Sequence, residues 1–324
     1  MKKRILVSLF FAMFITVYMS SISSAISFGP AVNLGSDVNT TGNERFPDIS
    51  TDALELYLAS DQTGNFDIYK STRAGTANSF GTPLTLGPTI NSTDSDNGPG
   101  ITPNNAFLFF SSDRTFSGDP SVGDQDIWVS ALSGGIPGSP SNVSLVNSSS
   151  DDFEPDIATG GLAMFFTSNR SGNNDLYVAK RDSMGDPWGS PTNLTAVNSG
   201  VADITPTISS DRLSLYFASN RSGGFGGFDL YVSTRSDTSS LFGAAVNLGA
   251  SINSSFDDMA PSISSDGTTL YFDSDRSGGV GGFDIYQSTA TAVPEPATIA
   301  LLGIGLFGLA GATVRRRLKK TKQQ

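Results

Sequence analysis

A unit of about 50 residues recurs five times along this chain, and the repetition constrains the fold more than any other feature. The fourth copy, residues 203–235, reads DITPTISSDRLSLYFASNRSGGFGGFDLYVSTR. Every copy carries a proline near its start: Pro47, Pro99, Pro155, Pro206 and Pro261. Repeats of this length are typical of proteins in which each repeat forms one supersecondary unit and packs against its neighbours.

The residues of the repeat predict strands. In the fourth copy Leu213, Leu215 and Phe217 fall on one face of an extended segment, and Tyr216 and Ala218 fall on the other. Apolar side chains on both faces indicate a sheet that is covered on both sides. Gly, Asn, Asp and Ser connect the segments, and these residues close tight turns.

A fourth strand follows the third one in four of the copies. These strands are expected at residues 83–87, 141–145, 191–195 and 245–249. Four strands in about 50 residues are typical of a β-propeller blade. The fifth copy has no such strand, but residues 28–35 match residues 242–249 almost one for one. We therefore expect the N-terminal strand to complete the last blade.

The predicted fold is all-β, a single propeller of five four-stranded blades over residues 26–290. The blade repeats begin near residues 44, 96, 152, 203 and 258. Closing the ring buries strand edges that an open array would expose to aggregation. An open solenoid would want polar capping repeats, which are not found. A six-bladed ring would need a sixth copy, and the spacings leave no gap for one.

The two ends of the chain differ from the repeats. Residues 1–25 have the basic start, apolar stretch and small-residue cleavage site of a signal peptide, which we expect to be helical and cleaved; a retained membrane anchor is the alternative. In residues 291–324 a Pro-Glu-Pro motif precedes an apolar segment, and we expect a transmembrane helix at 297–314 with a basic tail after it.

This C-terminal order of motif, apolar helix and arginine cluster resembles the PEP-CTERM sorting signal of Gram-negative bacteria. The residues that carry the resemblance are Pro294, Glu295, Pro296, Arg315, Arg316 and Arg317. The resemblance implies an exosortase-type sorting protease as a partner and a precursor held transiently in the inner membrane through the C-terminal helix. It also implies a product at the cell surface or in the extracellular space, with a link to exopolysaccharide.

The repeat itself resembles the TolB-type WD40-like propeller repeat, over about residues 28–288. The glycine-rich segments 222–229 and 277–284 are similar to repeats of OmpA-linked envelope proteins. Copies two and three depart from the pattern at their first turns, at 102–105 and 159–161. These departures weaken any expectation of five equal binding sites.

A carboxylate lies three residues before each repeat proline, and these acids form the first candidate site. They are Glu44, Asp96, Asp152, Asp203 and Asp258. Because inner strands line the central channel of a propeller, the acids could ring one mouth and bind Ca²⁺ or a polyhydroxylated ligand. Alternatively each acid caps its own turn, and the fivefold recurrence favours this interpretation. Glu154 breaks the repeat symmetry, since the other copies have Phe, Gly, Thr or Ala at its position.

A second candidate set lies in the loop after each second strand, which reads Ser-Asp/Asn-Arg in four copies and Ser-Asp-Gln in the first. Its charged residues include Asp113, Arg114, Arg170, Arg221, Asp275 and Arg276. An arginine fork could bind sulfate or uronate groups. We favour a structural role, in which each arginine pairs with the acid that opens the third strand, Asp229 in copy four, and staples the loop.

Composition limits the available chemistry. The chain contains no Cys and no His, which excludes disulfides, thiolate metal sites and histidine-dependent triads. The formal net charge is −11, and the repeats are more acidic than the whole because basic residues concentrate at both ends. Such a surface repels nucleic acid. We expect a monomer, with Ca²⁺ as the one possible cofactor.

These observations predict an exported, non-enzymatic propeller that is a binding or structural module of the bacterial envelope or extracellular matrix. Its expected partners are extracellular polysaccharide or envelope proteins. One alternative is a polysaccharide-cleaving enzyme with paired carboxylates at the channel mouth. The other alternative is a TolB-like periplasmic hub for protein interactions.

Overall fold

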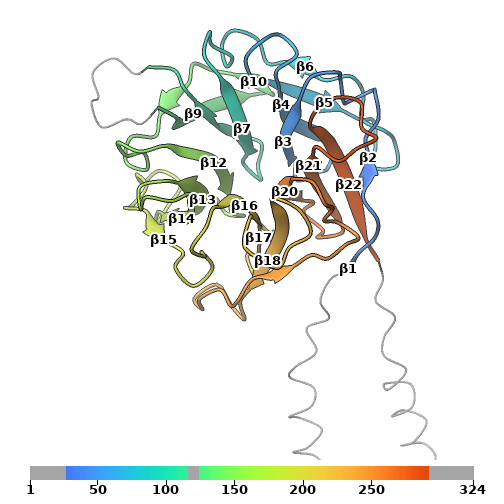
Figure 1. Cartoon of the computed structure of the whole chain (residues 1–324). Coiled ribbons are helices and arrows are strands. Elements are labelled where there is room, and N and C mark those ends of the chain that lie inside the picture. Colours follow the sequence, from blue (N-terminus) through green and yellow to red (C-terminus); the bar gives the residue numbers. More distant parts are fainter. Residues whose placement is uncertain (1–26, 116–123, 292–324) are drawn as a thin grey trace, which may run out of the picture. The chain divides into compact units, whose positions relative to one another are not determined.

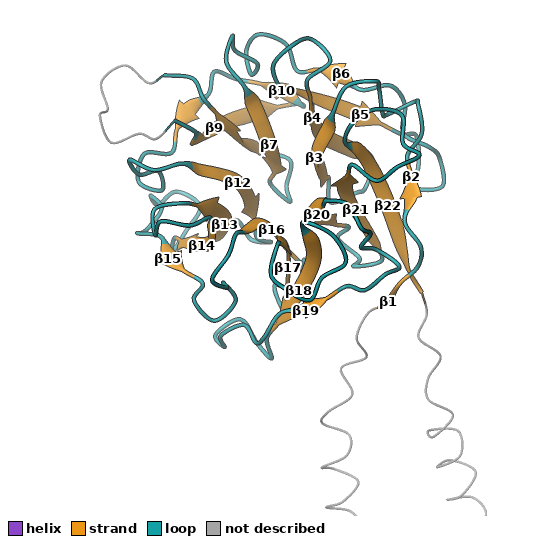
Figure 2. Ribbon diagram, viewed as in Figure 1, coloured by secondary structure: helices purple, strands orange, loops and turns teal. Residues whose placement is uncertain are grey.

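The computed structural model describes residues 27–115 and 124–291. The strands of these residues form five antiparallel sheets around a common centre (Figures 1 and 2). The compact unit Phe28–Ala290 is the propeller, so the prediction of an all-β fold with five blades is confirmed. No helix within the described residues is long and apolar enough to span a membrane. The predicted signal and transmembrane helices lie outside the described residues.

Each blade is one sheet, and in blades 1 to 4 the strands follow the chain from the centre outward. Blade 1 contains β3 (Glu44–Ile49), β4 (Glu55–Ser60), β5 (Asp67–Thr72) and β6 (Leu84–Thr85). Blade 2 contains β7 (Asp96–Ile101), β8 (Phe107–Ser112) and β9 (Asp126–Ser133), with β10 (Ile136–Pro137) and β11 (Ser141–Asn142) outside. Blade 3 contains β12 (Asp152–Ile157), β13 (Ala163–Ser168), β14 (Asp175–Lys180) and β15 (Thr192–Asn193). Blade 4 contains β16 (Asp203–Ile208), β17 (Ser214–Ser219), β18 (Asp229–Thr234) and β19 (Val246–Asn247).

Blade 5 is completed by the N-terminal strands, as the sequence predicted. It contains β20 (Asp258–Ile263), β21 (Thr269–Ser274) and β22 (Asp284–Thr291), with β1 (Ser27–Phe28) and β2 (Val32–Asn33) outside. β2 pairs antiparallel with β22, so that Val32 lies opposite Gln287. This is the pairing that β19 makes with β18 in blade 4, where Val246 lies opposite Val232.

Adjacent blades are joined by one backbone hydrogen bond that recurs at all five seams. The N–H of the acid that opens each inner strand donates to a carbonyl in the preceding blade, between its second and third strands. The bonds run from Glu44 to Phe283, Asp96 to Phe66, Asp152 to Gln125, Asp203 to Asn174 and Asp258 to Phe228. The seam that joins the two ends of the propeller therefore uses the same bond as the other four.

The apolar core lies between neighbouring blades. The second strand of blade 4 is buried on both faces, since Leu215, Tyr216 and Phe217 are all at most 3% exposed. At the closing seam, Leu56 and Leu58 of blade 1 belong to the same apolar cluster as Tyr271 of blade 5. Burying both faces explains why the strands are apolar on both faces.

Each inner strand contains a β-bulge at the residue before its proline. This residue has a positive φ in every blade: Phe46 (53°), Gly98 (53°), Glu154 (57°), Thr205 (53°) and Ala260 (48°). Four of the five are not glycine, so they adopt the left-handed conformation at some energetic cost. In return the bulge aims an N–H at the preceding blade, and that of Glu154 donates to Ser111 Oγ at 2.8 Å.

Candidate functional site

The five repeated acids are completely buried, with 0% of each residue exposed. In blade 4 the carboxylate of Asp203 accepts hydrogen bonds from the backbone N–H and the hydroxyl of Ser199, the latter at 2.8 Å. Asp96, Asp152 and Asp258 accept the same pair of bonds from Ser92, Ser148 and Ser254. These acids therefore cap the turns that precede their own strands.

The arginine of each Ser-Asp/Asn-Arg loop pairs with this buried acid. Arg221 Nη2 donates to Asp203 Oδ1 and, at 3.1 Å, to the carbonyl of Val197, while its Nε donates to Ser219 Oγ at 2.9 Å. The corresponding pairs are Arg114–Asp96, Arg170–Asp152 and Arg276–Asp258. The predicted pairing with Asp229 is wrong, because that carboxylate instead accepts the N–H of Phe225 at 2.7 Å in its own loop.

Aromatic rings complete the environment of these arginines. The guanidinium of Arg221 lies 5.2 Å from the ring centre of Phe217 and 4.9 Å from that of Tyr231. Such cation–π contacts hold the fork flat in the position that meets the carboxylate. A phenylalanine and a tyrosine likewise flank Arg170 and Arg276, and a phenylalanine and Trp128 flank Arg114.

Blade 1 reaches the same result with different residues. It has Gln62 where the other blades have arginine, and Glu44 where they have aspartate. The longer Glu44 side chain accepts directly from Ser60 Oγ at 2.7 Å, the position of the serine that binds the arginine Nε elsewhere. It also accepts the backbone N–H of Thr40 at 2.6 Å. In the other blades the arginine connects the buried acid to this serine, and in blade 1 the extra methylene of Glu44 lets the acid reach the serine itself.

The acid or amide beside each arginine has a separate task. Asp275 accepts the backbone N–H of Asp257 at 2.9 Å, and Asn169 accepts that of Asp151 at 3.0 Å. Asp113 differs, since it accepts from Gln125 Nε2 at 3.1 Å, and burial raises its pKa. Among the described residues no three acids gather in an arrangement that could hold a metal ion. Binding of Ca²⁺ by the repeated acids stays a prediction, and titration calorimetry with Ca²⁺ would test it.

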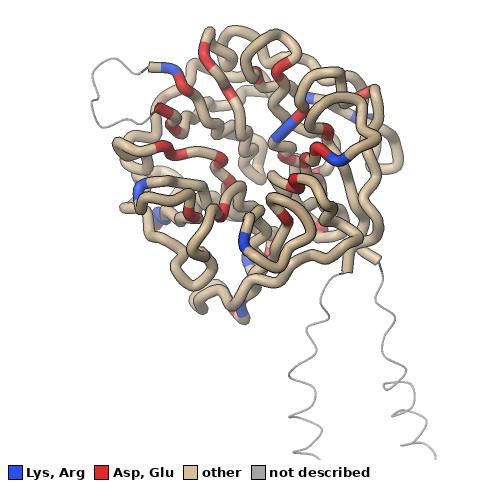
Figure 3. Tube along the Cα trace, viewed as in Figure 1, with Lys and Arg blue, Asp and Glu red and all other residues tan. Residues whose placement is uncertain are grey.

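A second group of acids lies deeper, where the five prolines and the bulges surround the centre of the ring; acidic positions are red in Figure 3. Asp48, Glu154 and Asp156 line a cavity of about 40 Å³ there, together with all five repeat prolines. A water molecule needs about 10–15 Å³ of such space. The cavity therefore has room for a few waters and excludes a sugar ring.

Glu154 is the repeat-breaking acid that the sequence singled out, and the structure places it at this centre. Its Oε2 accepts from Thr167 Oγ1 and from the backbone N–H of Thr205, both at 2.9 Å. Burial raises the pKa of Glu154 to about 7, although the hydrogen bond from Thr167 and the charge of Arg45 act in the opposite direction. The group can therefore hold or release a proton near neutral pH.

Asp48 and Asp156 are not among the acids predicted from the sequence. Asp48 accepts the N–H of Ile101 at 2.6 Å in blade 2 and the hydroxyl of Ser262 at 3.0 Å in blade 5, so it ties three blades together. Burial and the Asp156 carboxylate raise the pKa of Asp48 well above its usual range. Burial likewise raises the pKa of Asp156 to about 7.

A comparison of the copies one residue after the proline would have found this pair. That position holds Asp48, Gly100, Asp156, Thr207 and Ser262. The comparison that revealed Glu154 was made only one residue before the proline. Arg45 and Asp273 also depart from the repeat, since the other copies have no charge at either position. They form an ion pair of 3.4 Å that joins blade 1 to blade 5. A comparison of the copies at those two positions would have found them.

The C-terminal motif lies outside the described residues, but its sequence matches a known family. Residues 292–317 match the PEP-CTERM protein-sorting motif, which confirms that resemblance. The motif indicates export with a membrane-anchored sorting signal and implies recognition by an exosortase. A search of curated proteins finds no match to the sequence.

Solved structures share the propeller fold at low sequence identity. A thermostable family-43 glycoside hydrolase has a TM-score of 0.55 and 11% identity, over 81% of this chain and 98% of the hydrolase. The α-L-arabinofuranosidase PaAbf62A from Podospora anserina has a TM-score of 0.53 and 9% identity, over 82% of this chain and 97% of the enzyme. TolB from Acinetobacter baumannii has a TM-score of 0.48 and 19% identity over 82% of this chain, which spans 55% of that TolB. The likenesses to the two enzymes, with TM-scores above 0.5, show the fold alone.

Proposed function

We propose that this protein is an exported, non-enzymatic β-propeller that acts as a binding or structural module at the cell surface or in the extracellular matrix. The sorting motif supports delivery to the envelope. The proposal that the protein is not an enzyme depends on what its carboxylates contact. The repeated acids are buried in turn caps and, in four blades, in ion pairs. Asp48, Glu154 and Asp156, which we call the channel acids, line a cavity of only about 40 Å³.

A glycosidase needs two carboxyl groups about 5–10 Å apart with a sugar between them. The cavity of about 40 Å³ that these acids line is smaller than a sugar ring. The purified propeller, incubated with a panel of neutral and acidic polysaccharides, is therefore expected to release no reducing ends. Turnover that disappears in Glu154→Gln would overturn this proposal.

Glycan cleavage is a second candidate because of one observation on Glu154. Its pKa of about 7 suits a general acid that must be protonated at neutral pH. The same assay decides between the two candidates, with Asp203→Asn as a control for lost folding.

Delivery is tested separately. The tail should be removed in cells that have an exosortase and retained in cells that lack it. Retention in both would contradict processing through the sorting motif, while leaving the enzymatic question to the polysaccharide assay.

A further inference from the structure

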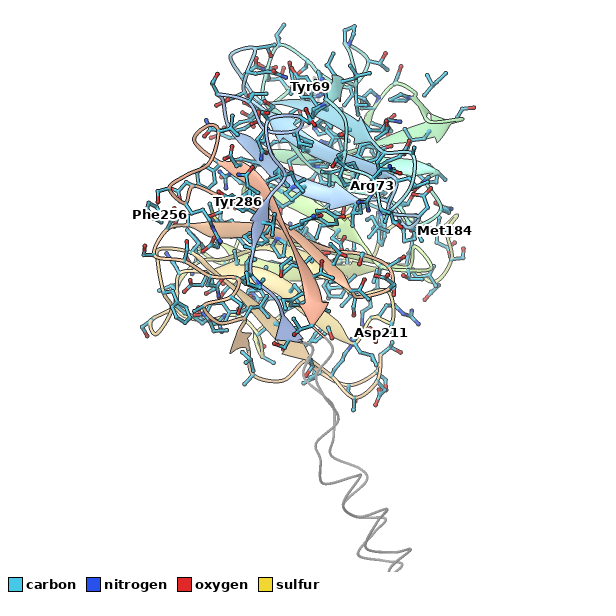
Figure 4. All side chains as sticks on the ribbon, turned by 90° about the vertical axis from the view of Figure 1, so that its right-hand side faces the viewer. Tyr69, Arg73, Met184, Asp211, Phe256 and Tyr286 are labelled. Atoms are coloured by element: carbon cyan, nitrogen blue, oxygen red, sulfur yellow. The ribbon has the colours of Figure 1, made fainter. Side chains whose placement is uncertain are left out.

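A wide open space lies at the closing seam of the propeller, between blade 5 and blade 1. It is a groove of about 590 Å³ whose walls come from both blades and from β2. Figure 4 turns the side of the ring with β22 and β5 toward the viewer and labels Arg73 there. The volume falls within the range of about 300–1,000 Å³ that is usual for ligand sites. We call this space the seam groove.

Arg73 is held rigidly in the groove wall. Its Nε donates to the carbonyl of Ala53 at 2.7 Å, and its Nη2 donates to Tyr271 Oη at 3.2 Å across the seam. The guanidinium lies 4.3 Å from the ring centre of Phe80, which packs edge-on against Tyr271. These contacts order the side chain before any ligand arrives, which lowers the entropic cost of binding.

The equivalent arginines in blades 3 and 4 each have an acid in the loop that follows them. Asp186 lies near Arg181, and Asp237 lies near Arg235. The loop of blade 1 from residue 74 to residue 79 reads AGTANS and has no acid. Arg73 therefore has no acid in its own loop, and it lines the groove.

Two carboxylates stand on the turns beside Arg73. Asp52 lies in the turn between β3 and β4, and Asp266 lies in the turn between β20 and β21. Hydrogen bonds from Ser50 and Ser264 lower the pKa values of Asp52 and Asp266 respectively, so both are ionised at neutral pH. Together with Arg73 they give the groove a net charge of one negative unit.

The remaining polar groups are hydroxyls and amides. Within the described part of the chain, the side chains of Asn78, Gln287 and Thr289 make no hydrogen bond, although all three line the groove. Gln287 is also a departure from the repeat: Val129, Val178 and Val232 take its position in blades 2 to 4, opposite an aromatic residue of the second strand. Blade 1 has Lys70 at this position, so blade 5 is the blade that places an uncharged amide there, and that amide lines the groove.

We propose that the seam groove binds a neutral saccharide through its vicinal hydroxyl groups, which bridge blade 1 and blade 5. Guanidinium, carboxylate and amide groups are planar and can each make two hydrogen bonds at once, a geometry that two neighbouring hydroxyls match. A uronate or sulfate would meet Asp52 and Asp266 at the rims and be repelled. The inference rests on the proposed function, because it names the ligand class of that binding module.

Gln287→Val is the sharpest variant, because valine already occupies this position in three blades and should leave the fold intact. Titration calorimetry with cellohexaose, xylohexaose and maltohexaose should show binding of at least one of these sugars. That affinity should fall about tenfold in Gln287→Val and again in Asn78→Ala. Thr234→Ala, on blade 4 and outside the groove, is the control and should leave the affinity unchanged.

Three results would overturn the proposal: no binding of any of the neutral sugars, unchanged affinity in both variants, or tighter binding of alginate oligomers. None of these affects the tests of export and turnover, so the seam groove and the proposed function can fail separately. Bound sugar should also raise the unfolding temperature of the full propeller, because it contacts both sides of the closing seam.

Discussion

The acids that open the blades and the acids around the central cavity both lie on inner strands, but they differ in how their charge is balanced. Asp203 and its counterparts are fully buried, and in four blades an arginine balances them. Asp48, Glu154 and Asp156 lie a few residues further along, occur in only one or two blades, and have raised pKa values because burial is not fully offset. Recurrence therefore marks the acids that build the ring, and departure from the repeat marks those that can change their protonation.

The largest difference should appear when one partner of a repeated pair is removed. Arg221→Ala leaves the Asp203 carboxylate buried with only its turn contacts. Loss of one partner of a buried ion pair typically costs about 3–5 kcal/mol of unfolding free energy. Urea denaturation measures it, with Gln62→Ala in blade 1 as the control that should cost less than about 1 kcal/mol. Equal effects of the two variants would break the distinction between the blades.

The channel acid Glu154 should make the stability of the propeller depend on pH. The pKa of Glu154 rises from its usual value of 4.5 to about 7 on folding. The contribution of Glu154 to stability is therefore fully present below pH 4.5 and is lost as the pH rises to 7. Relative to Glu154→Gln, the wild type should therefore lose on the order of 2–3 kcal/mol of stability over that interval. A pH-independent difference between the two proteins would contradict the raised pKa.

The blade 1 arrangement offers a test by transplantation. The double variant Asp203→Glu with Arg221→Gln copies Glu44 and Gln62 into blade 4. It should recover most of the loss seen in Arg221→Ala and remain within about 1–2 kcal/mol of the wild type, because the longer carboxylate can reach Ser219 as Glu44 reaches Ser60. A double variant as unstable as the single one would show that blade 1 depends on other residues.

The smallest effect is expected for Asp48→Asn. Burial and Asp156 favour the protonated form of Asp48, which an amide resembles in charge and shape. Thermal unfolding at pH 7 should differ from wild type by less than about 1 kcal/mol, whereas Asp203→Asn, which weakens an ion pair, should cost several times more. Comparable losses in both would erase the distinction between the two groups of acids.

Much of the ring could be predicted because every blade buries its strands with the same pattern of apolar residues. Five copies of one strand pattern gave the number of blades, and the match between residues 28–35 and 242–249 gave the closing strand. The partner of the loop arginine was predicted incorrectly, because Asp229 and Asp203 are both acids at fixed offsets from Arg221. Only the folded turn shows which of them the guanidinium reaches.

The sequence by itself determined the repeat, the strands, the ring closure and the sorting motif, since these depend on local periodicity and on similarity within one chain. The tertiary structure decided which charges meet. The cavity of Asp48, Glu154 and Asp156 and the seam groove around Arg73 arise where different blades come together. Contacts of that kind depend on the distance between blades and on burial, which no spacing along the chain records.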